Sequence, residues 1–199
     1  MQFLILSGNP IPDALCHGVT QEIVRGAADG GVEAPVLPIE GISDCRDCNE
    51  GWGVCRNEHV CTFGKDGFNE LHQQVRQADA LCVIMPAEHS QSGPAMTGFL
   101  ERLRRCEFGQ FGALASKPIL IVSFPDSADN SLLSCLEQMD RFCRQTGAVI
   151  FDHLGVNSWN SDYTRISAYY AGRAIAFGRK AGALAPRHHH SHHQHDLEQ

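Results

Sequence analysis

The chain has 199 residues, of which 43% are hydrophobic, a net charge of −7 and a pI near 5.8. This length and composition are enough for one substantial hydrophobic core, so we expect a single domain. The negative charge and the lack of a lysine- and arginine-rich run argue against a nucleic-acid partner. No apolar run approaches the roughly 18 residues that a membrane-spanning helix requires, so no membrane partner is expected.

The cellular compartment is inferred from the N-terminus and the cysteines. Residues 1–7 lack the basic region of a secretory signal. The chain nevertheless contains nine cysteines. In a protein without an export signal, such a content favours reduced thiols and metal ligation over a disulfide framework. The sequence therefore predicts a cytoplasmic protein.

A candidate anion site follows the first predicted strand. The continuously apolar residues 3–6 are typical of a strand buried on both faces of a parallel sheet. A turn-forming loop over residues 7–13 leads to a helical pattern, and this order leaves free backbone N–H groups at a helix N-terminus. The spacing is neither that of a G-x-G-x-x-G motif nor that of a Walker A loop, so a plain strand-to-helix turn is an equally good interpretation.

Predicted strands and helices alternate along the chain. The second strand contains Pro35 and is expected near a sheet edge, and the third is expected to stop at Pro86. This alternation predicts an α/β fold with a doubly wound parallel sheet. The strands are expected at residues 3–6, 32–37, 80–85, 118–124 and 148–151, and the helices at residues 14–28, 66–77, 94–106, 131–146 and 162–180.

Four cysteines lie close together after the second predicted strand, with the spacing C-x2-C-x6-C-x5-C. Gly51 and Gly53 allow the intervening chain to bend tightly. Four thiolates suit either a tetrahedral zinc site or an iron–sulfur cluster. A disulfide or thiol switch and unrelated loop cysteines are the alternatives, and Cys82, Cys135 and Cys143 are expected to be core residues. The candidate metal ligands are Cys45, Cys48, Cys55 and Cys61.

The end of the chain has a different composition, with six histidines in the eight residues 188–195. Such a tract binds divalent metal ions, or is a disordered extension, or is an added affinity tag. We expect one domain over residues 1–182, which includes a cysteine-rich loop at residues 43–65. A disordered histidine-rich tail is expected over residues 183–199.

Three segments of the chain resemble a known family. They are the strand at residues 3–7 with the loop Ser7-Gly8-Asn9-Pro10, the cysteine segment that ends Cys61-Thr62-Phe63-Gly64-Lys65-Asp66, and Met85-Pro86 before a helix that contains Phe99-Leu100-Glu101-Arg102-Leu103. With these segments, residues 1 to about 180 resemble the flavodoxin-like NAD(P)H-dependent FMN reductases, in particular their iron–sulfur flavoprotein branch. Members of that branch carry a C-x2-C-x2-C-x5-C cluster, whereas the second interval here is four residues longer.

The resemblance implies both a fold and an activity. It implies a five-stranded parallel sheet of order 2-1-3-4-5 with the cysteine-rich insertion after the second strand. It further implies a flavin-dependent oxidoreductase that takes hydride from NAD(P)H at FMN and passes electrons to a small-molecule or protein acceptor. The cysteines would hold an iron–sulfur cluster that relays electrons, or a structural zinc ion. A homodimer or homotetramer is expected, and no side chain is assigned as a catalytic acid or base.

The flavin is expected at the switch in strand order. In open parallel sheets, ligands bind outside the carboxyl ends of the strands at that point, which is formed here by the loops at residues 7–17, 86–93 and 123–130. The family's phosphate-binding Ser, Arg and Thr are replaced by Asn9, Ile11 and Cys16, so that backbone N–H groups would hold the phosphate. The residues expected to bind FMN are Ser7, Asn9, Pro10, Ala14, Leu15, Cys16, His17, Pro86, Ala87, Glu88, His89, Ser90 and Ser123.

Other functions are also compatible with these patterns. The family's aromatic residues after the third strand are missing, and Glu88 and His89 stand where hydrogen bonds to the ring or to a substrate would form. One alternative is therefore a zinc-stabilised flavodoxin-like binding module without redox activity. Another is a metal-handling protein that uses the cysteines together with the histidine-rich tail.

Overall fold

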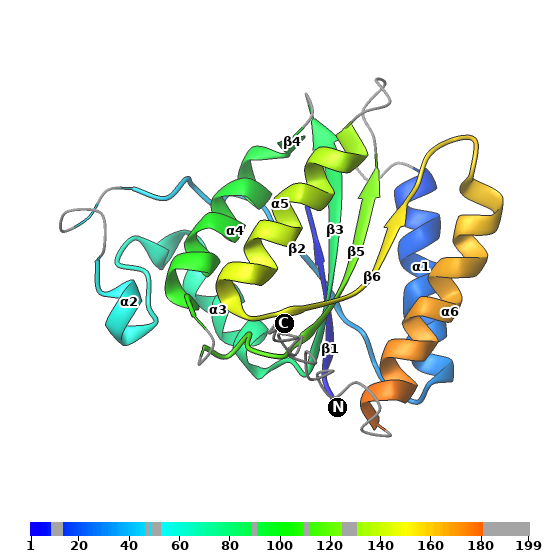
Figure 1. Cartoon of the computed structure of the whole chain (residues 1–199), viewed down its shortest axis with the longest axis horizontal. Coiled ribbons are helices and arrows are strands. Elements are labelled where there is room, and N and C mark those ends of the chain that lie inside the picture. Colours follow the sequence, from blue (N-terminus) through cyan, green and yellow to red (C-terminus); the bar gives the residue numbers. More distant parts are fainter. Residues whose placement is uncertain are drawn as a thin grey trace, which may run out of the picture.

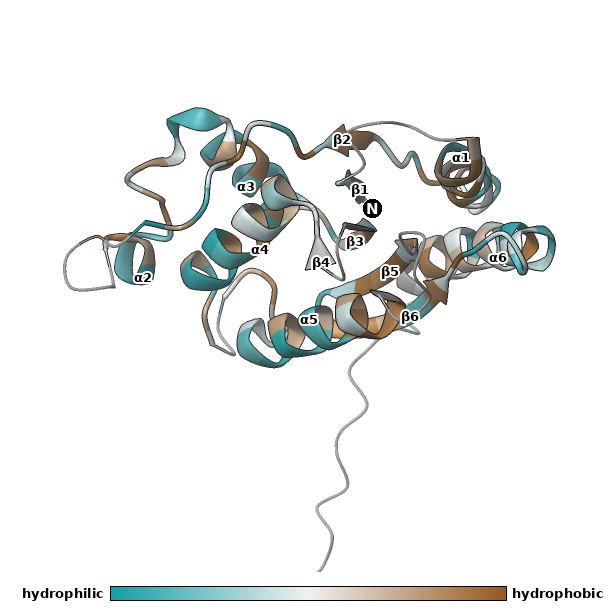
Figure 2. Cartoon of the chain, turned by 90° about the horizontal axis from the view of Figure 1, so that it is seen from above, coloured by the Kyte–Doolittle hydropathy of each residue, from teal (hydrophilic) through white to brown (hydrophobic). Residues whose placement is uncertain are grey.

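The computed structural model describes residues 1–8, 14–46, 48, 53–88, 91–109, 112–124 and 131–180. These residues form three layers, with a central sheet between two groups of helices (Figure 1). Figure 2 shows α1 and α6 on one face of the sheet and α3, α4 and α5 on the other. The helices are α1 (Ala14–Asp29), α3 (Phe68–Gln77), α4 (Pro94–Cys106), α5 (Ser131–Thr146) and α6 (Ser161–Lys180).

The sheet confirms the predicted fold class. Its five parallel strands lie in the order β2-β1-β3-β5-β6, which is 2-1-3-4-5 when the parallel strands are counted along the chain. The short β2 lies at an edge, as Pro35 indicated. The strands are β1 (Phe3–Ser7), β2 (Val36–Pro38), β3 (Ala80–Glu88), β5 (Pro118–Phe124) and β6 (Val149–Gly155).

The sequence suggested that the third parallel strand stops at Pro86, and this prediction is wrong. The strand continues to Glu88 and turns back to pair with an antiparallel two-residue strand, β4 (Gln91–Ser92). Strand β1 pairs with β3 only as far as Ile84, so Pro86 faces a free edge on that side. A missing backbone N–H is tolerated at such an edge, which explains why the proline does not end the strand.

Two apolar cores lie on the two faces of the sheet. One contains Cys135 and Cys143 with side chains of α3 and α4, and the other contains Cys82 with side chains of α1 and α6. All three cysteines are buried, which confirms their predicted packing role. Burial also raises the pKa of Cys143 to about 12, with a smaller contribution from Asp140, so this thiol is protonated at neutral pH.

Helices α1 and α6 pack with their backbones in contact, and two glycines make this approach possible. A Cβ atom on Gly172 would overlap the carbonyl oxygen of Ile23, and one on Gly26 would overlap the carbonyl oxygen of Tyr169. Backbone oxygens cannot rotate away as a side chain does. The spacing of the two helices therefore depends on the absence of side chains at these two positions.

No helix in the described ranges is long and apolar enough to cross a membrane. The proposed boundary at residue 182 and the histidine-rich tail lie outside the described residues.

The glycine contact gives a first prediction. Gly172→Ala should lower the free energy of unfolding by about 1–3 kcal/mol, because the new methyl group forces α1 and α6 apart. This loss is expected despite the gain of roughly 1 kcal/mol in helix propensity. Urea denaturation followed by circular dichroism measures the change.

The matched control for that variant is Gly155→Ala. Its new Cβ atom would lie 3.3 Å from a terminal methyl group of Leu132, which can move aside. The control should therefore change stability little. Equal losses in the two variants would contradict the role of the helix contact.

Candidate functional site

The carboxyl ends of three strands meet at one rim of the sheet. Ser7 of β1 is paired with Ile84 of β3, and Met85 of β3 is paired with Ser123 of β5. In Figure 1 these strands point to the upper edge of the molecule, where α1 and α5 begin. The order of the strands reverses between β1 and β3, so this rim is the switch point at which doubly wound sheets bind ligands.

Gly8 brings β1, β3 and α4 together at the rim. Its backbone N–H donates to the carbonyl oxygen of Ile84 at 3.0 Å. A Cβ atom here would lie 3.0 Å from the terminal methyl carbon of Met96 and 3.1 Å from its Cβ. The end of β1 can approach α4 this closely only because residue 8 has no side chain.

The first turn of α1 has the features of an anion site. It contains no acidic residue, and the first N–H groups of a helix have no partner within the helix. Ala14 and His17 are exposed, Leu15 is half-buried, and Cys16 is buried in the core beside α6. The side chain of Cys16 is thus used for packing, so this position offers a ligand only its backbone.

Ser123 has a partner that the sequence did not reveal. Its buried hydroxyl lies 2.9 Å from Nε2 of His153 on the neighbouring strand β6. Burial lowers the pKa of His153, and Asp152 opposes the shift only in part, so the ring is neutral at pH 7. The last strand was expected to end at residue 151, whereas it continues to Gly155, and this is why His153 was missed.

The remaining predicted flavin ligands are only partly described. Pro86, Ala87 and Glu88 belong to the end of β3, and Ala87 and Glu88 form the hairpin with β4. Asn9, Pro10, His89 and Ser90 lie outside the described residues. The assignment of the thirteen residues to FMN remains a prediction.

The four predicted metal ligands come together at a second site. They line a single cavity between the cysteine-rich loop and α4, and three of them are half-buried while Cys55 is buried. Cys55 begins a short helix, α2 (Cys55–Glu58), that was not predicted. The cavity is lined by Asp44, Cys45, Arg46, Cys48, Cys55, Cys61, Thr62, Phe63, Arg102, Arg105 and Cys106.

The thiols share the cavity without being in ligating positions. Among the residues that the structure describes, no three His, Cys, Asp or Glu side chains form a group able to hold a metal ion. Gly53 nevertheless leaves space for one of the sulfurs, because a Cβ atom there would lie 2.5 Å from Sγ of Cys48. Gly53 was expected to let the loop bend, and the structure shows that it also makes room for the Cys48 sulfur.

Burial and charge act in opposite directions on the thiols of the cavity. Burial raises the pKa of Cys45, although Arg105 acts in the opposite direction. Burial also raises the pKa of Cys106, a fifth cysteine in the cavity wall that the sequence did not single out, and Cys55 and Cys61 add to this effect. Arg105 beside Cys45 and Arg102 beside Cys106 bring positive charge that opposes the effect of burial, as a site for thiolates requires.

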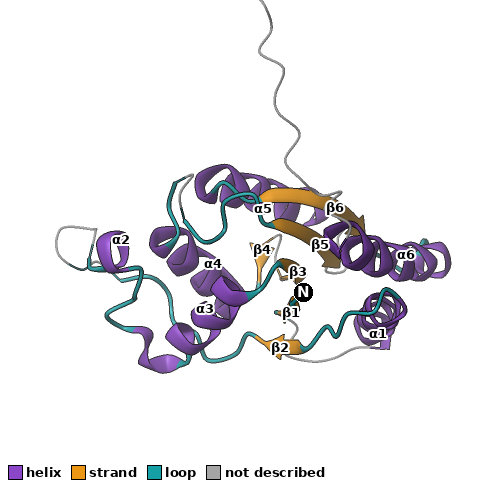
Figure 3. Cartoon of the chain, turned by 90° about the horizontal axis from the view of Figure 1, so that it is seen from below, coloured by secondary structure: helices purple, strands orange, loops and turns teal. Residues whose placement is uncertain are grey.

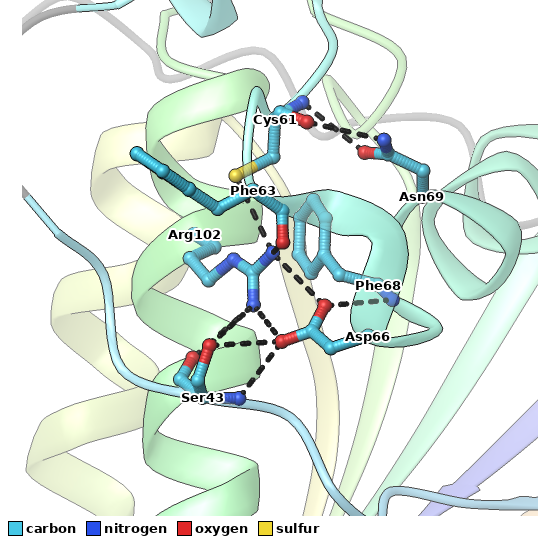
Figure 4. A network of polar contacts seen from close by, with 7 residues as sticks. All are labelled: Ser43, Cys61, Phe63, Asp66, Phe68, Asn69 and Arg102. Carbon is cyan, nitrogen blue, oxygen red and sulfur yellow. Dashed lines mark hydrogen bonds and ion pairs between the residues drawn. The ribbon is translucent and has the colours of Figure 1, made fainter. Parts of the chain in front are cut away.

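Arg102 joins α4 to the end of the cysteine-rich loop (Figure 4). Arg102 is 2% exposed, and its guanidinium group donates to both carboxylate oxygens of Asp66, at 2.7 and 3.1 Å. It also donates to Sγ of Cys61 at 3.4 Å and to the carbonyl oxygen of Phe63 at 3.0 Å. The Phe68 ring lies 4.4 Å from its Cζ atom and adds a cation–π contact.

Asp66 also holds the start of the loop. One of its oxygens accepts hydrogen bonds from the backbone N–H of Ser43 at 3.0 Å and from its hydroxyl at 2.9 Å. Burial raises the pKa of the Asp66 carboxyl, but the hydrogen bonds from Arg102 and Ser43 outweigh it and hold that pKa well below its usual range. Asn69 fixes Cys61 through two hydrogen bonds of 3.1 Å to its backbone. Both ends of the loop are thus attached to one buried ion pair.

Comparison with protein families identifies the chain. The sequence model for NADPH-dependent FMN reductases matches residues 1–160. The protein belongs to this family. No curated protein sequence gives a significant match.

Solved structures agree with this FMN reductase fold. A flavone reductase superposes with a TM-score of 0.67 at 16% identity, over 92% of this chain and 64% of that chain. An NAD(P)H:quinone oxidoreductase from Methanothermobacter marburgensis has a TM-score of 0.61 at 15% identity, and the match covers 88% of this chain and 98% of that chain. A flavodoxin from the domain Archaea has a TM-score of 0.59 at 11% identity, and the match covers 90% of this chain and 99% of that chain. At these identities the structures establish the fold, and the family establishes an NAD(P)H-dependent flavin oxidoreductase.

The buried ion pair gives a second prediction. Arg102→Met should lower the free energy of unfolding by about 1–3 kcal/mol, because the partly buried Asp66 loses the two charge-assisted hydrogen bonds from Arg102. The folded-state pKa of Asp66 is depressed, so its contribution is complete above the unfolded pKa of about 3.9 and is lost as the pH falls. As the pH falls below about 4, the stability of the variant should therefore decrease less than that of the natural protein.

The matched control is Arg104→Met on the same helix. Arg104 is paired with Glu101 near the surface, and such pairs contribute about 0–1 kcal/mol. Chemical denaturation of both variants at several pH values makes the comparison. If Arg102→Met behaves like the control, the ion pair does not hold the loop in place.

Proposed function

We propose that this FMN reductase holds its flavin at the rim formed by the ends of β1, β3 and β5. The observation that carries the proposal is that β1 leads at the switch point into Gly8, which packs closely against β3 and α4, and that the next helix, α1, begins with a turn free of acidic residues. Both features suit the close approach of a phosphate group to backbone N–H donors. When bound, FMN supplies the hydride and electron chemistry.

The residues of the chain bind and orient the cofactor in this proposal. Backbone N–H groups from Ala14 to His17 would hold the phosphate, and the exposed His17 stands on the same turn. The hairpin of β3 and β4 would border the ring, with Glu88 as a hydrogen-bond acceptor. The pair of Ser123 and His153 fixes the end of β5 beside it.

A third prediction tests the phosphate position. His17→Glu should weaken FMN binding by roughly 5-fold or more, because a negative charge in the first turn opposes the helix dipole and repels the phosphate. Riboflavin has no phosphate, so its affinity should change little. Quenching of flavin fluorescence on titration measures both affinities.

The control places the same charge one turn further along α1. Gln21 is exposed, and Gln21→Glu should affect FMN binding much less than His17→Glu. Reduction of the bound flavin by NADPH then tests the activity of each protein. A protein that fails to bind added FMN, or an equal loss in both variants, would overturn the proposed flavin position.

The cysteine cavity is proposed as a metal centre of the same enzyme. The support is that four thiols line one cavity, that Gly53 makes room for Cys48, and that Arg102 donates to the sulfur of Cys61. Hydrogen bonds to ligand sulfurs are a common part of thiolate metal sites. Both an iron–sulfur cluster and a structural zinc ion fit this set of donors.

Helix α4 relates the two sites to each other. Met96 in its first turn touches the position of Gly8 at the rim, and Arg105 and Cys106 at its other end line the cysteine cavity. With a rise of 1.5 Å per residue, residues 96 and 105 lie about 14 Å apart along the helix. An iron–sulfur cluster in the cavity would thus relay electrons between the flavin and an acceptor, whereas zinc would only hold the loop.

A fourth prediction concerns the metal. Anaerobically purified protein should contain about one zinc ion or one iron–sulfur cluster per chain, and Cys55→Ser should remove most of it. Elemental analysis and visible absorption distinguish iron with sulfide from zinc. Cys135→Ala, which changes a buried cysteine outside the cavity, should keep the metal.

Removal of residues 187–199 separates the cavity from the histidine-rich tail. The metal content should remain unchanged in the shortened protein. Metal that persists in Cys55→Ser but disappears with the tail would contradict the cysteine site. A colourless protein that contains zinc and ignores FMN would instead support a binding module.

A further inference from the structure

The outer face of α6 carries an exposed apolar stripe. We define the α6 stripe as Trp159, Tyr163, Ile166, Tyr170 and Phe177, whose exposed fractions range from 58% to 92%. Trp159 lies in the turn just before α6, and Tyr163, Ile166, Tyr170 and Phe177 follow one another at intervals of three, four and seven positions, so these four lie along one side of the helix. The exposed Arg173 lies at the edge of this side, between Tyr170 and Phe177. Large apolar side chains gathered on one face of a helix call for a binding partner.

No described element covers this stripe. The opposite face of α6, with Ala168, Ile175 and Ala176, packs into the core that it shares with α1. Figure 1 shows α6 at the outer margin of the molecule, and Figure 3 shows the same arrangement from below. The histidine-rich tail over residues 183–199 is a poor cover, because Leu184 and Leu197 are its only two large apolar residues.

The size of the stripe is sufficient for a dimer. Aromatic side chains present about 150–250 Å² each, so the stripe exposes roughly 600 Å². This is the upper end of the patches found on monomers, which measure about 300–600 Å². Two such surfaces together would bury about 1,200 Å², which is the lower end of the range for specific protein interfaces.

The order of the side chains is symmetric about Tyr170. Ile166 and Ala174 lie four positions to either side of it, and the rings of Tyr163 and Phe177 lie seven positions to either side. If two α6 helices crossed antiparallel at Tyr170, Ile166 would meet Ala174 of the partner subunit. Tyr163 would likewise meet Phe177 of the partner subunit. A two-fold axis requires a self-complementary surface of this kind.

The charged residues of the helix are compatible with this pairing. Asp162 would lie opposite Gly178 of the partner subunit, and Arg173 opposite Ser167 of the partner subunit. Gly178 is buried and Ser167 is uncharged, so neither Asp162 nor Arg173 would face a like charge. Electrostatic repulsion therefore does not oppose the association.

The central ring is already held in place. Tyr170 lies edge-on to Tyr169, with ring centroids 5.1 Å apart and planes at 77°. Tyr169 in turn donates a hydrogen bond of 2.8 Å to Asp29 and lies under the guanidinium group of Arg25. A ring that is fixed before binding loses little conformational freedom in the complex, which favours affinity.

We propose that the α6 stripe binds a second copy of this chain, in an antiparallel helix pair with its two-fold axis at Tyr170. The proposal concerns the face of the molecule that α1 and α6 cover, and it does not depend on which cofactor the rim binds. It assigns a surface to the homo-oligomer that the sequence led us to expect.

The experiment is sedimentation equilibrium on the full-length protein. The natural chain, of 21.8 kDa, should sediment at an even multiple of this mass. Tyr170→Arg places two guanidinium groups face to face at the axis and should weaken self-association about 30-fold or more, halving the particle mass. Leu133→Arg on α5, a residue 67% exposed and outside the stripe, is the matched control and should leave the mass unchanged.

A charge pair tests the antiparallel arrangement. Ile166→Glu alone should dissociate the particle, and adding Ala174→Lys should restore it, since each lysine would face a glutamate of the partner subunit. Circular dichroism confirms that every variant is folded. Failure of the double variant to recover would overturn the antiparallel pairing.

Other results would overturn the proposal as a whole. One is a monomeric natural protein, and another is an oligomer that Tyr170→Arg leaves intact. Binding of the monomer to phosphatidylcholine vesicles, lost in Tyr170→Arg, would assign the stripe to a lipid surface instead. FMN affinity of each variant, measured in parallel, shows whether the rim is affected independently.

Discussion

The buried ion pair of Arg102 and Asp66 is the interaction on which the cysteine cavity depends. Asp66 accepts hydrogen bonds from Ser43 at the start of the loop, and Arg102 donates to Cys61 and Phe63 near its end. Cys55 and Cys61 pack against the hydrophobic core between these two ends. Charge-assisted hydrogen bonds to Arg102 and Asp66 therefore attach both ends of the loop to α4 and to the turn before α3.

Helix α4 gives the two proposed sites a common support. Its beginning contacts the end of β1 through Met96 and Gly8, and its end provides Arg102, Arg105 and Cys106 to the cavity. The helix is packed between the sheet and the loop, so the separation between rim and cavity is fixed by its length. A chemical relay between a flavin and a metal centre requires such a constant distance.

The other face of the sheet is organised by close contact instead of charge. Gly26 and Gly172 let α1 and α6 approach until their backbones touch, which buries one side of α6 completely. The opposite side keeps its tyrosines and Phe177 in contact with solvent. The helix thus combines a tightly packed inner face with an outer face whose large apolar side chains are exposed.

The sequence by itself determined the parallel α/β fold, the buried strands and the cysteine group. These follow from apolar runs, helical periodicity and spacing, which are local properties of the chain. Only the tertiary structure decided that Arg102 meets Asp66, 36 residues away, and that His153 meets Ser123, 30 residues away. It also brought Cys106 to the cavity and left the α6 stripe uncovered by any described element. Such pairings depend on how whole elements pack, because burial and partner choice are set by neighbours that are distant in sequence.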